Sequence, residues 1–313
     1  MSASRQRARR QRWLRVAFGV FALVVAVLLV RYARGIDWPA VATALAGFDA
    51  GTLVLVAALA LLSYLTYASY DLAARRYTGH ALSTPRVLGI GMTAYAFALC
   101  VGAAIGSAGF RLRMYAHSGL RIGTISRIIG FSVTSNWLGY GLLAGVLFAG
   151  GAISPPPQWN VGGGWLRAIG VLMLVLVLAY LAACAAWHDR VLHVRGHHHL
   201  RLPTAGLGAL QVLLGAINWS LMALMVYVLM DGAHAWPLVA GTLLLAAVAS
   251  ALVHIPAGIG VIEAVFIAVL AGGVPDPRIL AALLAWRAIY YVAPLLLAIG
   301  FYLAFEARGK RSA

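Results

Sequence analysis

The chain has 313 residues, of which 63% are hydrophobic and only 10% are charged, and its formal net charge is +16. A soluble domain carries about a quarter charged residues, so this composition excludes a soluble enzyme or binding module and indicates a membrane protein. The positive charge is scattered over short loops. That distribution argues against nucleic-acid binding and suits loops that orient the protein or attract anionic lipid headgroups.

The N-terminal segment begins with a basic stretch at residues 1–12 and continues into an apolar run. It looks like a signal peptide, but Arg31 and Arg34 follow the run without a small-residue cleavage site. We therefore expect an uncleaved first span at residues 13–30, with the N-terminus in the cytoplasm.

Five further apolar runs approach the ~20 residues needed to cross a bilayer. They cover residues 52–72, 128–148, 166–187, 207–230 and 280–305, and a cytoplasmic basic tail at 306–313 follows. Two other apolar stretches, residues 87–108 and 237–270, are interrupted by glycines. The expected fold is an all-α polytopic membrane protein with a single transmembrane domain at residues 13–305.

The two interrupted stretches share a pattern in which closely spaced glycines are followed by a charge. The predicted helix breaks are Gly106 and Gly109 before Arg111, and Pro256, Gly258 and Gly260 before Glu263. An open backbone and a buried charge persist in a membrane only where protein or a wet cavity shields them. Glycine breaks at corresponding places in two halves of a chain are typical of a transport site.

The distribution of arginines favours a re-entrant path for both stretches. If residues 87–108 crossed fully, the segment 111–127 and the loop 189–201 would lie outside, against the positive-inside bias. If this stretch returns instead, nearly all basic residues and both termini lie in the cytoplasm. We therefore expect six full spans and two re-entrant hairpins, near 87–110 and 237–272. The hairpins enter from opposite faces, as in an inverted repeat.

Five residues near the breaks are candidates for a substrate site. Glu263 either caps its own half-helix or contributes to a polar site, and acids inside a membrane are commonly functional. Arg287 either neutralises Glu263 or binds a lipid phosphate, and the helical rise places both at similar depth, within salt-bridge reach. Arg111, Arg113 and Tyr115 are either ordinary cytoplasmic-loop residues or a site for a headgroup phosphate.

A second set of polar residues lies in the span at 52–72. Tyr64, Tyr67 and Tyr70 fall mostly on one face, where tyrosines usually pack or anchor a helix at the interface. Asp71 most simply pairs with Arg75 one turn further on.

Patterns for catalysis or cofactor binding are absent from the sequence, which has no Gly-x-Ser-x-Gly, His-Glu-x-x-His, P-loop or paired carboxylates. The tract His197, His198 and His199 is a weak metal signal, since three neighbours need not converge on one ion. Cys100 and Cys184 form no CxxC pair. We expect no enzyme activity, no catalytic residue, no cofactor and no metal.

Three stretches carry a resemblance to a known family. They run from Gly106 to Tyr115 with Gly119 and Leu120, from Ile255 to Glu263, and from Ala281 to Pro294. Together they resemble the transmembrane region of lysylphosphatidylglycerol synthases and its stand-alone YbhN-like inner-membrane relatives. The resemblance implies a flippase of the bacterial inner membrane. No soluble aminoacyltransferase domain follows residue 313, so we expect that this chain does not make lysyl-lipid.

We expect a lipid flippase or transporter whose substrate is a phospholipid, possibly aminoacylated, with an anionic phosphate. The expected substrate-binding residues are Arg111, Arg113, Tyr115, Glu263, Arg287 and Tyr291. A homo-oligomer or a lipid-synthesis enzyme is the expected protein partner. The alternatives are a membrane-embedded transferase acting on polyprenyl phosphate, and a non-transporting partner of a lipid-synthesis enzyme.

Overall fold

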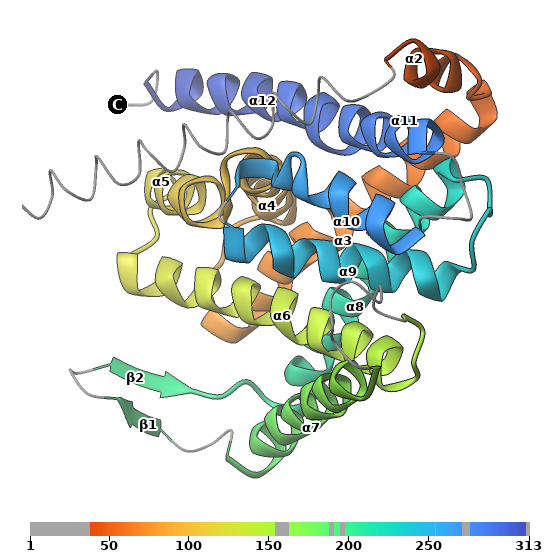
Figure 1. Cartoon of the computed structure of the whole chain (residues 1–313). Coiled ribbons are helices and arrows are strands. Elements are labelled where there is room, and N and C mark those ends of the chain that lie inside the picture. The colour runs from red at the N-terminus through yellow and green to blue at the C-terminus, as the bar shows by residue number, and fades with distance from the viewer. Residues whose placement is uncertain are drawn as a thin grey trace, which may run out of the picture.

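A computed structural model of the chain describes residues 38–153, 163–187, 191–194, 198–253, 255–270 and 276–310. Within these ranges the chain is helical apart from turns and one short β-hairpin (Figure 1). The first span, expected at residues 13–30, lies outside the described residues, as does the basic stretch before it.

Most of the described residues lie in eleven α-helices. The α-helices are α2 (Trp38–Ala46), α3 (Ala50–Thr78), α4 (Thr84–Val101), α5 (Phe110–His117), α6 (Ile122–Ala149), α7 (Gly163–Trp187), α8 (Ala205–Leu229), α9 (Trp236–Val253), α10 (Val261–Leu270), α11 (Asp276–Arg287) and α12 (Ala293–Lys310). Three short turns interrupt them: the π-helices η1 (Ala103–Gly109) and η4 (Ala288–Val292), and the 3₁₀-helix η3 (Pro256–Gly258). The α11–η4–α12 segment lies along one side of the molecule in Figure 1, and α7 lies on the opposite side.

Among the described residues, seven helical segments are long and apolar enough to cross a membrane, namely α3, α4, α6, α7, α8, α9 and the α11–η4–α12 rod. Their apolar residues also face outward. On α7, the side chains of Val171, Leu172 and Leu176 are 53%, 56% and 60% exposed. Apolar surface on this scale marks contact with other apolar material, so the chain is a multi-pass membrane protein.

Polar residues at helix ends explain where the longest helices begin and stop. Asp49 precedes α3 and accepts a hydrogen bond from the Thr52 backbone N–H at 2.9 Å. The hydrogen bonds from Thr52 lower the pKa of the Asp49 carboxyl. Gly79 ends α3 with a φ of 73°, the left-handed conformation that glycine adopts without steric penalty. Thr204 caps the start of α8 in the same way as Asp49 caps α3.

Helix α8 occupies the centre of the bundle and packs against α3, α6, α7 and α9. Its crossing with α6 is unusually close, because Gly215 of α8 meets Gly139 of α6. A Cβ atom added to either glycine would collide with the backbone of the other helix. Small residues at such crossings let two membrane helices approach closely.

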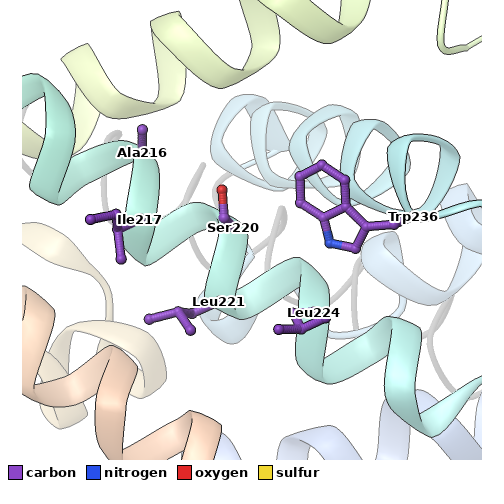
Figure 2. Close-up of a pocket in the computed structure, with 6 residues that line it drawn as sticks. All are labelled: Ala216, Ile217, Ser220, Leu221, Leu224 and Trp236. Carbon is purple, nitrogen blue, oxygen red and sulfur yellow. The ribbon is translucent and has the colours of Figure 1, made fainter.

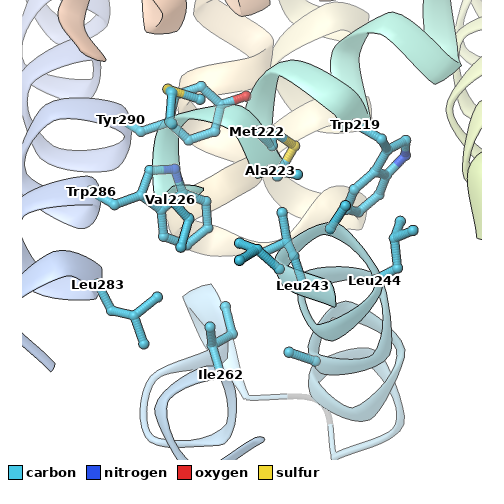
Figure 3. Packing of buried hydrophobic residues seen from close by; sticks show 14 of the residues in the cluster. Trp219, Met222, Ala223, Val226, Leu243, Leu244, Ile262, Leu283, Trp286 and Tyr290 are labelled. Atoms are coloured by element: carbon cyan, nitrogen blue, oxygen red, sulfur yellow. The ribbon is translucent and has the colours of Figure 1, made fainter. Parts of the chain in front are cut away.

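The main core extends over most helices of the bundle, and one part of it lies between α8, α9, α10 and the α11–η4 segment (Figure 3). Met222 and Val226 of α8 face Leu243 of α9 and Trp286 of α11, and all four are at most 5% exposed. The core therefore contains both helices of the pair α9 and α10, whereas Met114 and Tyr115 of α5 pack in a second cluster with Ile90 of α4 and Ile125 of α6.

Helix α2 and the strands that follow α7 are absent from the sequence-based expectations. Helix α2 packs Val41 against Leu280 and Ala281 of α11. The loop after α7 contains strands β1 (Val191–Val194) and β2 (His198–Arg201), which pair antiparallel. The helix and the strands lie outside the long apolar runs, where hydropathy carries no signal.

Candidate functional site

The first glycine break reverses the direction of the chain. Helix α4 ends at Gly102, whose φ of 99° is a conformation that favours glycine. The ring of Phe110 then stacks on that of Phe97 with centroids 3.7 Å apart, whereas a continuous helix would separate these residues by about 20 Å. The predicted breaks at Gly106 and Gly109 lie inside η1, just after this turn. Gly106 packs so closely that a Cβ atom there would collide with the Phe97 carbonyl.

Just beyond η1, the completely buried Arg111 forms a bidentate ion pair with Asp71 of α3. Its Nε donates to Oδ2 at 3.0 Å and its Nη2 donates to Oδ1 at 3.0 Å. Its Nη1 donates to the hydroxyl of Ser107 in η1. The guanidinium carbon also lies 5.3 Å from the centre of the Tyr67 ring. Both α3 and the break itself therefore hold this guanidinium in place.

The carboxylate of Asp71 has three side-chain partners from two elements, α5 and α6. Besides Arg111 of α5, it accepts hydrogen bonds from the Ser132 hydroxyl of α6 at 2.6 Å and the Tyr115 hydroxyl of α5 at 2.9 Å. The expected pair of Asp71 with Arg75 is therefore wrong. Arg75 donates instead to the carbonyl of Leu82, which lies between α3 and α4. A buried, bidentate partner from another helix prevails over a neighbour one turn away.

The second glycine break lies where the sequence predicts it. Between α9 and α10, the residues Ala257, Gly258 and Gly260 have φ values of 56°, 60° and 81°. Pro256 begins the 3₁₀ turn η3. Helix α10 then packs back against α9 (Figure 1), so this pair of helices also folds back on itself.

Arg287 of α11 and Glu263 of α10 stabilise the backbone of the second break. The Nε of Arg287 donates to Glu263 Oε1 at 2.7 Å, which confirms the predicted salt bridge. The other guanidinium nitrogens donate to the carbonyls of Ala257 and Gly258, at 2.7 Å and 3.2 Å. Glu263 accepts a hydrogen bond from the Gly260 N–H at 2.8 Å. The ion pair thus satisfies backbone groups that the interrupted helix leaves open.

The two breaks share one arrangement with the charges exchanged. At the first, the folded-back pair supplies the cation Arg111 and a neighbouring helix supplies Asp71. At the second, the folded-back pair supplies the anion Glu263 and a neighbouring helix supplies Arg287. In each case the guanidinium lies over a tyrosine ring, which at the second break is Tyr291 at 5.5 Å.

A third cluster, which we call the polar centre, consists of Ser63, Tyr95, Asn218 and Tyr290. All four side chains are at most 5% exposed. The Ser63 hydroxyl donates to Asn218 Oδ1 at 2.8 Å and lies 2.6 Å from the Tyr290 hydroxyl. The Tyr95 hydroxyl lies 2.7 Å from that of Tyr290 and accepts a hydrogen bond from Asn218 Nδ2 at 3.2 Å. Four helical segments, α3, α4, α8 and η4, therefore meet at these hydrogen bonds.

Aromatic rings connect the polar centre to both ion pairs. Tyr67, which lies under the first guanidinium, stacks on Tyr95 with ring centroids 3.7 Å apart. Tyr290 contacts the ring of Tyr291, which faces the second guanidinium, with ring centroids 5.8 Å apart. A continuous run of polar and aromatic side chains thus joins one helix break to the other inside an apolar bundle.

Two buried donors beside this run, the Tyr70 hydroxyl and the Trp286 Nε1, have no hydrogen-bond partner among the described residues. The ring of Trp286 stacks on that of Tyr290 (Figure 3), and the ring of Tyr70 lies 4.7 Å from that of Tyr67. Buried donors without a partner are unusual in proteins. Both donors are therefore available to a ligand that reaches this run of polar and aromatic side chains.

The structure places the other predicted site residues unequally. Tyr115 joins the first ion pair through its bond to Asp71. Arg113 does not join that pair, because its exposed side chain lies over the Tyr302 ring of α12, at 5.8 Å.

Sequence reasoning missed the polar centre. Ser63 and Asn218 are polar residues within largely apolar helices, and that contrast was the available signal.

A separate apolar pocket of about 410 Å³ lies along α8, next to the start of α9 (Figure 2). Ile217, Leu221 and Leu224 line it together with Trp236 of α9, and Ser220 is its one polar lining residue. With no charged side chain in its lining, this pocket suits hydrocarbon.

No group of three histidine, cysteine or acidic side chains that could hold a metal ion occurs in the part of the chain that the structure describes. Of the tract noted in the sequence, His198 and His199 lie in β2, and His197 lies outside the described residues.

Comparisons with known proteins agree along nearly the whole chain. Residues 13–298 match the family described as "Lysylphosphatidylglycerol synthase TM region". The inner membrane protein YbhN of Escherichia coli strain K12 is 40% identical over 293 residues, which cover 93% of this chain and 92% of that protein. The uncharacterized protein slr0712 of Synechocystis is 29% identical over 281 residues, 88% of this chain and 86% of that protein.

Proposed function

The chain belongs to the lysylphosphatidylglycerol synthase transmembrane-region family, and on that premise we propose that it is a flippase that moves phospholipid between the leaflets of the bacterial inner membrane. The proposal rests on the run of buried charged and polar side chains between the two breaks. A charge inside a membrane costs at least ~3 kcal/mol. Replacing a buried ion pair by apolar residues of similar volume often leaves the stability of a protein unchanged or raises it. Glu263 and Arg287 also stabilise the second break, but a protein that needs only a stable bundle has little reason to keep the whole run of buried charges.

The chemistry of each ion pair suits exchange with a lipid headgroup. A guanidinium can release a carboxylate and bind a phosphate in the same bidentate geometry. The released Asp71 or Glu263 then needs a positive partner, because an unpaired buried carboxylate is strongly destabilising. A headgroup with both a phosphate and an amine supplies both partners. We infer that zwitterionic or aminoacylated phospholipids are better substrates than purely anionic ones.

We propose that the α4–η1–α5 and α9–η3–α10 segments are re-entrant hairpins that enter from opposite faces, as an inverted repeat. The arginine distribution and the exchanged charges at the two breaks support this topology. Cysteines at Ser118 and Gly196 should then react with an impermeant thiol reagent only in broken cells. A cysteine at Val161 should react in intact cells. Labelling of position 118 in intact cells would contradict the re-entrant topology.

The remaining predicted site residues have supporting roles in this proposal. Arg113, on the exposed side of α5, meets the phosphate before it reaches Arg111. Tyr115 holds the carboxylate of Asp71, and Tyr291 holds the guanidinium of Arg287. Both buried carboxylates are engaged in ion pairs, so we propose transport rather than a transferase reaction.

The test is a leaflet-resolved lipid assay on the purified protein in liposomes. Arg287→Gln should strongly lower the rate at which a labelled phospholipid becomes accessible to an external quencher. The matched control is Arg278→Gln, which removes an arginine from an exposed pair with Asp231. If both variants and the wild type move lipid no faster than empty liposomes, transport is refuted. The protein would then be better described as the non-transporting partner of a lipid-synthesis enzyme.

A further inference from the structure

A groove of about 730 Å³ runs between α3, α4 and the η4–α12 segment. Its walls include Ala57 of α3, Gly89 of α4 and Phe301 of α12, and the only hydroxyl groups in its lining belong to Tyr64 and Thr93. The volume lies within the ~300–1,000 Å³ typical of ligand sites. The lining suits a hydrocarbon chain and offers almost nothing to a polar ligand.

The length of the groove corresponds to one leaflet. Its α4 wall extends from Pro85 to Thr93 and its η4–α12 wall from Ala288 to Phe301. At the helical rise of 1.5 Å per residue, the first wall is about 12 Å long and the second about 20 Å. The hydrocarbon core of a bilayer is ~30 Å thick, so one leaflet contributes about half of that. The groove therefore covers most of the depth that one acyl chain occupies.

The two ends of the groove differ in chemistry. At one end, the exposed Arg86 follows Pro85, and its guanidinium carbon lies 6.0 Å from the centre of the Phe305 ring. At the other end, the Tyr64 hydroxyl donates to the backbone carbonyl of Tyr290 at 3.1 Å, so this end borders the polar centre. A cation thus stands at the mouth and the polar run stands at the inner end.

We propose that this groove binds one acyl chain of a phospholipid, whose phosphate is held at the mouth by Arg86. The charge of Arg86 complements the phosphate, and the apolar walls match the chain in character and length. The binding itself is independent of transport. Its role as the loading position for the polar run rests on the function proposed above.

The test uses the full chain in liposomes with a phospholipid that carries a photoreactive diazirine near the end of one acyl chain. Cross-links should map to α3, α4 and α12 several-fold more often than to the exposed apolar face of α7. Two variants fill the groove, Gly89→Leu and Ala57→Leu, and both should reduce this labelling to the level of α7. Ala179→Leu adds the same bulk to an exposed alanine of α7 and should leave it unchanged.

A second comparison tests the phosphate contact. Arg86→Gln should lower labelling by the phospholipid probe but not by a diacylglycerol probe, which has no phosphate. Arg76→Gln, at an exposed arginine near the end of α3, should affect neither probe. Equal labelling of the groove and α7, or labelling that survives both groove-filling variants, would overturn the acyl-chain site. An Arg86→Gln variant that binds both probes like the wild type would overturn the phosphate contact.

The transport rate separates this site from the proposed function. If the groove is labelled as expected but no lipid is moved by the wild type, the site stands and the flippase proposal fails. If Gly89→Leu and Ala57→Leu lose the label but transport at the wild-type rate, the flippase proposal stands and the loading role is overturned.

Discussion

Neutralising the Asp71–Arg111 pair one side chain at a time, and then both together, separates its structural from its functional role. Both side chains are completely buried. The carboxylate accepts hydrogen bonds from Arg111, Tyr115 and Ser132. Asp71→Asn leaves the guanidinium as an uncompensated buried charge, and Arg111→Gln leaves the carboxylate in the same state.

The structure indicates the size of these effects. Removing one partner of a buried ion pair costs about 3–5 kcal/mol of unfolding free energy. The double variant Asp71→Asn/Arg111→Gln leaves no buried charge, and neutral replacements of buried pairs are often neutral or stabilising. We therefore expect the double variant to recover most of the stability. Its deviation from additivity should far exceed the ~0.5 kcal/mol typical of independent sites.

The assay combines unfolding of each variant under the same lipid conditions with lipid movement in liposomes. We expect the double variant to be nearly as stable as the wild type but unable to move lipid, because no guanidinium remains to bind the phosphate. A stable double variant that transports at the wild-type rate would refute the functional role of the pair. Strictly additive losses of stability would refute the claim that the two residues act as one buried ion pair.

Three further predictions concern other parts of the bundle. Gly215→Leu should lower the free energy of unfolding by at least about 1–3 kcal/mol, because the new side chain meets Gly139. Gly206→Leu on the same helix should be tolerated, since nothing lies near its Cβ position. Equal thermal stability of the two variants would contradict the close crossing. Tyr290→Phe removes a hydroxyl from the polar centre, so the free energy of unfolding should fall by about 1–3 kcal/mol and lipid movement should slow. A variant that matches the wild type in both stability and transport rate would count against the polar centre. Arg278→Gln should change stability by less than ~1 kcal/mol, as measured by thermal unfolding, because its ion pair is exposed; a larger loss would show that this pair is not an ordinary surface contact.

Features that depend on local composition could be predicted from the sequence. Apolar runs located α3, α6, α7, α8 and the α11–α12 segment, and glycines located the second break. The Glu263–Arg287 pair was also predictable, because the rise of a helix alone sets the depth of each residue along its own span. The topology of the two folded-back pairs relative to the membrane stays a prediction.

Features that depend on which helices pack together were not accessible in this way. Asp71 has a basic neighbour one turn away, yet it pairs with a residue of α5, because the first break turns that helix back against the bundle. Ser63 and Asn218 are 155 positions apart and become partners only because α3 packs on α8. The turn of the first break lies at Gly102, where a positive φ is needed, and glycine content alone does not distinguish that position from Gly106.

The most direct test of the central claim is the rate of lipid movement by the purified wild-type protein. Liposomes with and without the protein would carry a labelled zwitterionic phospholipid on one leaflet, and an external quencher would report its appearance on the other. We expect the protein to accelerate this exchange well above the rate in empty liposomes, and more for zwitterionic than for purely anionic lipid. Equal rates with and without the protein, for every headgroup tested, would contradict the account.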